Sequence, residues 1–534
     1  MNQQENHSNY EREGNDITAA DMVVPEQDSD LLNFYENSTI FITGATGFLG
    51  KLCMEKLLRT CSVRKIYILV RSKKGKDIEK RFEELFDEPS FDPLKRLKPD
   101  FRSKVEFIKG DACLPDLGIS IEDQEKIISE VDCIFHYAAT VRFDEKLRTA
   151  TYINVRALRD LLRIAKHVKK LRAFVHVSTA FSNCINNHID ETFYTPPITG
   201  DKLIRLVECL DDNQLNSITP GLLGEYPNTY AFTKSTAEEL LRSEGNNLPV
   251  VLFRPSIVTA TYKEPISGWI DNVYGATGVL LGVAIGLLRV LRGDANNYAD
   301  MVPADYVVNC SLATAWEVAT LKSLNNNDEH SGQAKLEIPV FNYVSTPEKP
   351  LTWNEFRFYS RKHCLRIPSE KCIWFGYLFL ITNMYLCLVM QMLLHTIPAY
   401  LVDFIAVCLR KEPKLVKGYE KIHKFSKVIE YFTLGNWKFE NGNTQALWKK
   451  LKIQDKQLFD FSMKNLTWDS YFYVYTRGSR VYIVKDPLDT IPQGRKWYRK
   501  LWIMHYTSVA IVTLLSLKLV MFIFSNLGIL SILY

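Results

Sequence analysis

The sequence predicts an α/β fold: a doubly wound parallel sheet, then a mainly helical C-terminal module and a C-terminal transmembrane helix. Short runs rich in β-branched and aromatic residues recur in the N-terminal half, and helical patterns such as residues 49–58 and 158–168 separate most of them. This alternation favours parallel pairing, because each helix provides the crossover between two strands. After Pro350 the character of the chain changes towards long apolar runs. The predicted strands are residues 39–43, 65–70, 104–108, 133–135, 173–177 and 250–253.

The composition limits the class of protein. A length of 534 residues suggests two or three domains, and a hydrophobic content of 46% means that any membrane segments are local. The net charge of +5 is small for this length and gives no reason to expect nucleic acid. The 11 cysteines lack the spacing of a metal site, and we see no secretory signal. We therefore expect no metal and a reducing compartment.

Several segments are expected to lie outside the sheet. Residues 1–33 are polar and acidic without periodicity, so we expect a disordered tail and a folded domain that begins near Phe34. Of two later apolar runs, residues 372–394 are long enough to cross a bilayer, whereas residues 397–409 alone are not. These runs predict either a hairpin (372–409) lying partly in the membrane or a buried helical pair.

The end of the chain is the best candidate for a membrane anchor. Residues 503–534 are apolar except for Lys518 and small polar residues, and the preceding residues 493–500 are basic. A lysine at mid-bilayer costs on the order of 3 kcal/mol, which is the main objection to a span. The positive-inside tendency places residues 1–500 on the cytosolic side.

A glycine-rich loop at residues 43–50 directly follows the first predicted strand and opens a helix. That placement is typical of a dinucleotide-binding loop in a Rossmann-type sheet. Gly44 permits the tight turn, Gly47 lets the backbone approach a pyrophosphate, and Gly50 lets the helix pack closely. The free N–H groups at the helix start favour negative charge.

The end of the second strand indicates which cofactor binds. Enzymes that prefer NAD usually place a carboxylate there to hold the ribose, whereas this chain has Arg71 and two following lysines. Arg71 can pair with a 2′-phosphate, so the sequence predicts NADPH. Asp111, after the third strand, suits the adenine edge. Ala138 and Ala139, after the fourth, let the backbone approach the cofactor.

Tyr230 and Lys234 form the predicted catalytic pair. Their spacing places both on one face of a helix, so that the phenol and the ammonium point into one site. We expect the ammonium to lower the phenol pKa, and Tyr230 to donate a proton to an oxygen that becomes negative as hydride arrives. Thr179 or Ser178, at the end of the fifth strand, is expected to hydrogen-bond the same oxygen.

With these motifs the sequence resembles the extended short-chain dehydrogenase/reductases. Within them it is similar to the eukaryotic fatty acyl-CoA reductases over nearly all of residues 34–485. The stretches that carry this resemblance are residues 41–50, 138–145, 174–180, 254–260, 268–272, 471–482 and Lys485.

The resemblance implies reduction of a long-chain acyl-CoA to a primary alcohol with two NADPH, through a hemithioacetal and an aldehyde and with release of CoA. It assigns Tyr230 and Lys234 to the catalytic pair, Thr179 to the usual Ser/Thr position and Asn154 to positioning the active-site helix. Tyr137 and Ala45 depart from the family pattern in ways that bear on substrate fit. The expected cofactor contacts are Thr43, Gly44, Thr46, Gly47, Phe48, Leu49, Gly50, Arg71, Asp111, Ala138, Ala139, Tyr230, Lys234, Pro255 and Ile257.

The resemblance also implies a domain order. It predicts an NADP-binding reductase domain at residues 34–350, a C-terminal family module at 351–490 and the anchor at 503–534. The apolar, glycine-spaced residues 275–290 could be a core helix, an acyl tunnel or a bilayer contact. The expected partners are the acyl-CoA and a lipid bilayer, and we favour the endoplasmic reticulum over the peroxisome.

Two other functions stay open at this point. Another membrane-bound reductase of the same superfamily could act on a sterol or other lipid ketone. The chain could also be an inactive cofactor-binding scaffold on membranes. The presence of Thr179, Tyr230 and Lys234 argues against a scaffold.

Overall fold

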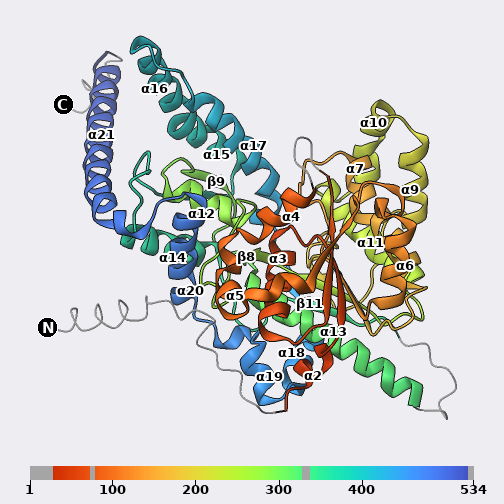
Figure 1. Ribbon diagram of the computed structural model, residues 1–534. Helices are drawn as coiled ribbons and strands as arrows, with labels where there is room; N and C mark the ends of the chain where they lie inside the picture. The colour runs from red at the N-terminus through yellow and green to blue at the C-terminus, as the bar shows by residue number, and fades with distance from the viewer. Residues whose placement is uncertain (1–27, 73–77, 328–336, 527–534) are drawn as a thin grey trace. The chain divides into compact units, whose positions relative to one another are not determined.

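A computed structural model of the protein describes residues 28–72, 78–327 and 337–526 (Figure 1). Most of the predicted disordered tail, residues 1–27, lies outside these ranges. Its last residues, however, are ordered: helix α2 (Asp30–Tyr35) begins after the N-cap Ser29. The Ser29 hydroxyl donates to Asp455 Oδ1 at 2.5 Å, and the Leu31 N–H donates to the same oxygen. These bonds to a distant carboxylate tie the chain down before Phe34.

A parallel sheet of seven strands confirms the predicted fold class. Its order is β11-β7-β5-β4-β1-β2-β3, and every pair is parallel. Central strands such as β1 are buried along their whole length, which is why they read as continuous apolar runs. The strand order reverses between β1 and β4, where ligands bind in such sheets. The strands are β1 (Thr39–Thr43), β2 (Lys65–Val70), β3 (Val105–Lys109), β4 (Cys133–His136), β5 (Ala173–Val177), β7 (Val250–Pro255) and β11 (Val340–Tyr343).

Helices cover both faces of this sheet, with α6 and α11 on one face and α3 and α13 on the other (Figure 1). Three short strand pairs lie outside the main sheet among the described residues: β6 with β13, β8 with β10, and β9 with β12 in the later helical part of the chain. The further elements of this part of the chain are α3 (Phe48–Thr60), α4 (Ile78–Phe86), α5 (Asp92–Leu97), α6 (Ile121–Glu130), α7 (Leu147–Thr151), α8 (Ala157–Ala165), β6 (His188–Ile189), α9 (Gly200–Cys209), α10 (Asp212–Leu223), α11 (Thr229–Glu244), β8 (Ile257–Thr259), β10 (Met301–Pro303), α13 (Ala304–Asn327), β13 (Lys438–Phe439), α18 (Gly442–Lys450), α19 (Ile453–Leu458) and α20 (Trp468–Gly478).

The chain divides into two compact units, and the division differs from the predicted boundary at residue 350. The first unit comprises the described residues of Met1–Asn272, Asn296–Trp353 and Tyr431–Gly478. The last of these segments belongs with the sheet because Trp437 and Phe439 are buried in its hydrophobic core. The second unit is formed by Val273–Ala295, Asn354–Glu430 and the described part of Ser479–Tyr534.

The second unit is mainly helical. The glycine-spaced run predicted at residues 275–290 contributes α12, most of which is buried, as expected for a core helix. Its Gly286 has φ +78°, and an added Cβ would lie 2.1 Å from the Trp374 carbonyl oxygen. The elements are α12 (Ala276–Ala284), β9 (Val290–Arg292), α14 (Trp353–Arg366), β12 (Phe379–Ile381), α15 (Met384–Gln391), α16 (Ile397–Cys408), α17 (Leu415–Leu434) and α21 (Ile491–Asn526).

The apolar residues 372–409 fold differently from either prediction. Residues 372–381 are not helical, because Cys372 and Phe375 pack against α21 and β12 pairs with β9. A single candidate membrane span, Met384–Cys408, follows, in which a π-helical turn joins α15 to α16. Its apolar side chains are mostly exposed, which excludes a buried pair. Asp403, the one charge in the run, accepts the first N–H groups of α17.

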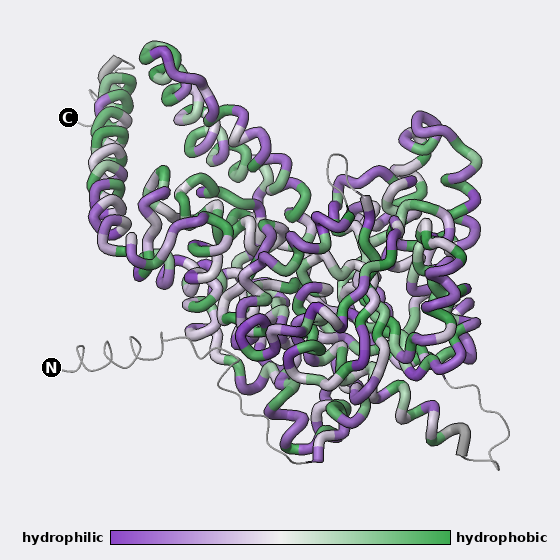
Figure 2. Tube along the Cα trace, in the orientation of Figure 1, coloured by the Kyte–Doolittle hydropathy of each residue, from purple (hydrophilic) through white to green (hydrophobic). Residues whose placement is uncertain are grey.

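A second candidate span, Leu488–Phe524, includes most of α21 and confirms the apolar C-terminal helix. None of its most apolar stretch is buried against the protein. Figure 2 shows that α16 and the distal part of α21 are mostly apolar; their charged residues are Asp403 and Lys518. The last part of the predicted anchor, residues 527–534, lies outside the described residues.

Candidate active site

The glycine loop between β1 and α3 has the backbone geometry that the sequence predicts. Gly44 has φ +73°, and an added Cβ would lie 2.6 Å from the Ala138 N atom. A Cβ on Gly50 would lie 2.3 Å from the Gly44 carbonyl oxygen, so the helix start can approach the loop only without a side chain. Gly47 is exposed and is the N-cap of α3, with no acidic residue in the first turn. The loop therefore suits a pyrophosphate.

The other predicted cofactor residues end neighbouring strands at this edge of the sheet. The Thr43 hydroxyl lies 2.6 Å from His136 Nδ1 and 3.4 Å from the Ala138 N atom, which links the ends of β1 and β4. Arg71 is exposed after β2. Asp111, after β3, accepts the Cys113 N–H. Pro255 ends β7, and its carbonyl accepts the N–H of Ala180, which follows β5. Ile257 begins β8.

Tyr230, Lys234 and Thr179 come together as predicted. Asn228 caps α11 by accepting the Ala231 N–H at 2.9 Å, which places Tyr230 in the first turn and Lys234 one turn later. The Tyr230 side chain lies near Thr179, whose hydroxyl acts to lower the Tyr230 pKa. The buried Lys234 Nζ donates to the Val177 carbonyl at the end of β5, at 2.8 Å.

The pKa values of the pair differ from the sequence expectation. Burial raises the pKa of Tyr230 to about 12, and the negative charge of Glu238 acts in the same direction, whereas the Thr179 hydroxyl opposes them. Burial lowers the pKa of Lys234 to about 8, against the opposing effect of Glu238. The expected lowering of the phenol pKa is therefore wrong, since desolvation of the phenolate dominates. Tyr230 keeps its proton at neutral pH.

Ser178 and Thr179 have different roles, because their side chains contact different groups. The Ser178 hydroxyl donates to Glu238 Oε1 at 2.5 Å, and the same carboxylate forms a buried ion pair with Arg254 at 2.6 Å. Asn183 donates to its other oxygen. Ser178 thus supports a buried ion pair, and Thr179 is the hydroxyl that meets Tyr230.

Asn154 lies between α11, the helix that carries Tyr230, and the loop after β4. It belongs to a π-helical turn, and its amide donates to Thr233 Oγ1 on α11 at 2.9 Å. Its carbonyl oxygen accepts the Thr140 N–H at 3.0 Å. One buried side chain therefore ties the helix that carries Tyr230 to the loop after β4.

Sequence reasoning missed an aromatic group beside Tyr230. The Phe143 ring stacks on Tyr230 with centroids 5.6 Å apart, and Phe432 lies 5.3 Å from Phe143. Phe181 and Trp437 continue the group. Phe143 lies inside a stretch that carries the resemblance, but Phe432 is about 200 residues from Tyr230 in sequence and no periodicity links them. Among the described residues, no group of three His, Cys, Asp or Glu could hold a metal.

Comparison with known proteins gives the family. Two family models, both described as male sterility protein, match residues 42–311 and 394–486. The fatty acyl-CoA reductase wat of Drosophila melanogaster is 42% identical over 487 residues, which is 91% of this chain and 92% of that protein. Fatty acyl-CoA reductase 1 of Homo sapiens is 38% identical over 483 residues, with 90% and 92% covered. The chain belongs to the fatty acyl-CoA reductase family.

Solved structures support the fold of this fatty acyl-CoA reductase family member. The reductase domain of a non-ribosomal peptide synthetase from Mycobacterium tuberculosis aligns with a TM-score of 0.53, at 18% identity, over 85% of this chain and 96% of that one. The terminal R domain of the myxalamid PKS-NRPS pathway gives 0.52, at 19% identity, over 85% and 93%. With the NAD-binding family model over residues 42–311, these likenesses indicate a reductase fold for a nicotinamide cofactor.

Proposed function

We propose that this protein reduces long-chain fatty acyl-CoA to a primary fatty alcohol, with NADPH as reductant and a membrane as its location. The observation that carries the proposal is the placement of Tyr230 and Thr179 near the buried Lys234, at the strand ends that also carry the glycine loop. This arrangement provides a proton donor and a nucleotide loop at one edge of the sheet. The names of the relatives supply the acyl-CoA substrate.

The residues present fit a bound NADPH. Gly44, Gly47 and the N-terminus of α3 would hold the pyrophosphate, and Arg71 would pair with the 2′-phosphate. When bound, the cofactor supplies hydride to the carbonyl carbon, once for each of two reductions. The balanced reaction consumes one acyl-CoA, two NADPH and two protons, and forms one alcohol, one CoA and two NADP⁺.

Residues of the chain hydrogen-bond the substrate oxygen and protonate it. Tyr230 donates its hydroxyl proton to the substrate oxygen as that oxygen gains negative charge, and Thr179 hydrogen-bonds the same oxygen. While Lys234 is protonated, it places a positive charge one helical turn from Tyr230. The hemithioacetal that results loses CoA by cleavage of its C–S bond, which leaves an aldehyde. The second reduction uses the same donor.

The surroundings of Tyr230 suit a fatty chain and direct reduction. Phe143 and Phe432 are partly exposed aromatic rings; Phe143 stacks on the Tyr230 ring, and Phe432 packs on Phe143. Such rings favour an apolar ligand. Cys184, a thiol in the same hydrophobic core as Phe181 and Trp437, has its pKa raised to about 12 by burial, which does not suit a nucleophile. Hydride transfer onto the thioester without a cysteine adduct is consistent with both features.

The proposal is tested with membranes that contain the full-length protein. Given NADPH and acyl-CoAs of graded chain length, these membranes should release fatty alcohol and free CoA, with two NADPH oxidised for each alcohol. NADH at the same concentration should support a much lower rate, because it lacks the phosphate that Arg71 would hold. Turnover of a sterol ketone with none of any acyl-CoA would overturn the substrate assignment.

The proposed topology is tested separately. Residues 495–500 contribute four exposed basic side chains just before the most apolar part of α21. The positive-inside tendency then puts the catalytic unit on the cytosolic side. Protease added outside sealed vesicles should digest residues 1–500, whereas protection of that region would reverse the orientation.

A further inference from the structure

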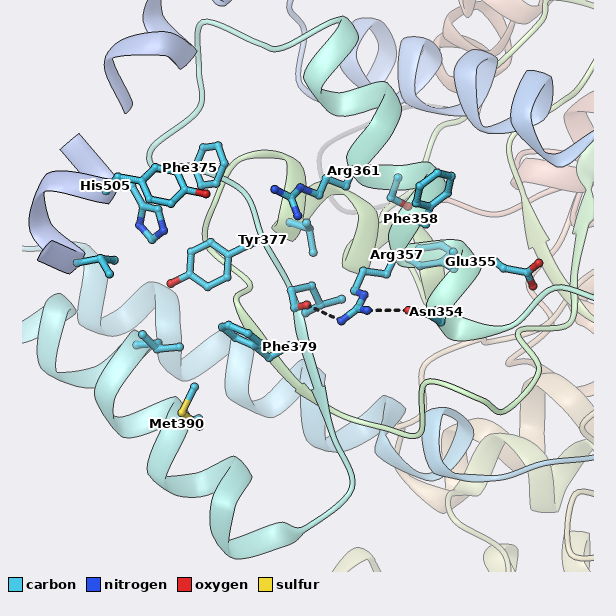
Figure 3. Close-up of a pocket in the computed structure, with 17 residues that line it drawn as sticks. Asn354, Glu355, Arg357, Phe358, Arg361, Phe375, Tyr377, Phe379, Met390 and His505 are labelled. Atoms are coloured by element: carbon cyan, nitrogen blue, oxygen red, sulfur yellow. Dashed lines mark hydrogen bonds between the residues drawn. The ribbon is translucent and has the colours of Figure 1, made fainter. Parts of the chain in front are cut away.

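The second unit contains a cavity of about 880 Å³ that the proposed reaction does not use. Five elements form it: α12, α14, residues 375–379, α15 with the π-helical turn that follows it, and the start of the apolar part of α21 (Figure 3). Its volume is within the range of ligand pockets, roughly 300–1,000 Å³. Every lining residue belongs to the second unit.

Most of the wall of this cavity is apolar. Phe375, Tyr377 and Phe379 follow one another along the non-helical segment before α15, and Figure 3 shows their rings on one side of the cavity. Met390 comes from α15, and Val509 from α21. A fatty chain fits such a wall, because it removes apolar surface from water without needing hydrogen bonds.

The α14 side of the cavity carries two cations. Arg357 and Arg361 are one turn apart on α14, and Figure 3 shows both guanidinium groups on the cavity side of that helix. Arg357 is held in place by donating to Asn354 Oδ1 at 2.6 Å and to the Leu378 carbonyl at 3.4 Å. Arg361 is exposed. Glu355, the one carboxylate in the lining, points away from the Arg361 side (Figure 3).

Both candidate membrane spans contribute to the lining. Met390 and Leu394 lie in Met384–Cys408, and His505, Tyr506 and Val509 lie in Leu488–Phe524. The exposed basic residues of α21 are a few positions before His505 in sequence. In a membrane-bound chain, the start of such a span lies at the level of the lipid headgroups. The cavity thus combines an apolar wall, two arginines and a position beside the bilayer.

We propose that this cavity binds an anionic phospholipid from the membrane, with its phosphate at Arg357 and Arg361 and one acyl chain along the wall of Phe375, Phe379 and Met390. Arginine suits the phosphate because its planar group can donate two parallel hydrogen bonds. The acyl chain enters from the same bilayer that receives α15–α16 and α21. A zwitterionic phospholipid, which has no net negative charge, binds more weakly.

The test uses the full-length protein in lipid nanodiscs that contain a small proportion of a photoreactive lipid. The probe is phosphatidic acid with a diazirine on its acyl chain, and the matched neutral probe is phosphatidylcholine with the same chain. Peptide mapping after illumination should place the phosphatidic acid adducts on residues 353–366, 375–379 or 384–396. Arg357→Gln/Arg361→Gln should lower that labelling on the order of tenfold.

The control is Lys202→Gln/Arg205→Gln, which removes two exposed cations one turn apart on α9 in the other unit. This control should label like the unchanged protein. Equal labelling by the two probes, or no loss in Arg357→Gln/Arg361→Gln, would overturn the proposal. Displacement of the probe by added acyl-CoA would overturn it as well, by assigning the cavity to the substrate. Labelling requires no turnover, so this result is independent of the alcohol-forming assay.

Discussion

Burial of Tyr230 sets the protonation state on which its proposed reactivity depends. Its raised pKa, about 12, keeps the phenol protonated at neutral pH. In the direction of reduction this is the useful state, because the site must give a proton to an oxygen that becomes a strong base. An ammonium that lowered the phenol pKa would instead favour the reverse reaction. The structure therefore fits a reductase better than the sequence expectation did.

Replacing Tyr230 by Phe is the direct test of this role. Tyr230→Phe removes only the hydroxyl and keeps the ring that stacks on Phe143. We expect alcohol formation to fall by about 10²–10⁴-fold, which is the usual contribution of a positioned acid. NADPH binding, followed by cofactor fluorescence, should stay within about twofold. Activity close to that of the unchanged protein would show that another group donates the proton.

Lys234 predicts the pH dependence of the reaction. Its pKa of about 8 lies below the ordinary value of 10.5, because burial disfavours the ammonium. The positive charge is present below about pH 8 and is lost as the pH rises through that value, so kcat/KM should fall on the alkaline side with a midpoint near 8. Lys234→Arg, which stays charged, should retain low activity without this alkaline fall. A kcat/KM that stays constant from pH 7 to pH 9 would contradict the assignment.

The lowered pKa of Lys234 also makes the free energy of unfolding depend on pH. Between about pH 8 and 10.5 the unfolded chain holds a proton on Lys234 that the folded chain has released. Stability therefore rises with pH across that window as far as this group is concerned. Activity and stability should move in opposite directions there. An activity loss at pH 9 is thus expected without a lower unfolding temperature.

At the scale of elements, the turn between β1 and α3 depends on two features of Gly44, its positive φ and its close approach to the backbone after β4. Gly44→Ala forces an alanine into φ +73° and places its Cβ 2.6 Å from the Ala138 N atom. Because the obstacle is backbone, we expect a loss of NADPH affinity of at least tenfold together with lower stability. Cofactor titration and thermal unfolding measure the two effects.

Gly221→Ala is the matched control. Gly221 lies in α10, is exposed, and has no heavy atom within 4 Å of an added Cβ. Alanine in a helix interior is favoured over glycine by about 0.5–1 kcal/mol, so this variant should be as stable as the unchanged protein or slightly more so. A similar loss of NADPH binding in both variants would show that the Gly44 contacts are not the cause.

The elements of the site could be predicted from sequence wherever one strand, loop or helix carries the pattern. Gly44, Tyr230 and Lys234 are of this kind, because their roles depend on neighbours within a few residues. The choice between Ser178 and Thr179 is different. It depends on Glu238, one turn beyond Lys234, and on Arg254 in another strand. No local pattern encodes which hydroxyl a distant ion pair will recruit.

For the whole molecule, the parallel sheet could be predicted because each strand is a buried apolar run beside a crossover helix. The division into units could not. The chain leaves the sheet unit at Asn272 and returns at Asn296, then returns again at Tyr431. These returns depend on packing between segments far apart in sequence. The apolar residues 372–394 were similarly ambiguous, since composition alone does not separate the packed Phe375 from the exposed span that begins at Met384.

The two candidate spans of the second unit predict how the whole protein holds to a membrane. Truncation after Tyr506 removes the most apolar part of α21 and keeps Tyr498 and Leu501, which pack on Phe375. The exposed apolar side chains of Met384–Cys408 remain. We therefore expect the truncated chain to stay membrane-associated but to be extracted by milder detergent than the full-length protein.

The contribution of Met384–Cys408 is then isolated by adding charges to it. In the truncated chain, Leu401→Asp/Phe404→Asp places carboxylates on two exposed apolar positions of α16, where entry into hydrocarbon costs about 2.5–3.5 kcal/mol for each. After vesicle flotation this variant should remain in the bottom fraction of the gradient, with its far-UV circular dichroism unchanged. Leu401→Ala/Phe404→Ala keeps the surface apolar and should remain on the vesicles. Release of the chain by truncation alone would instead leave α21 as the whole anchor.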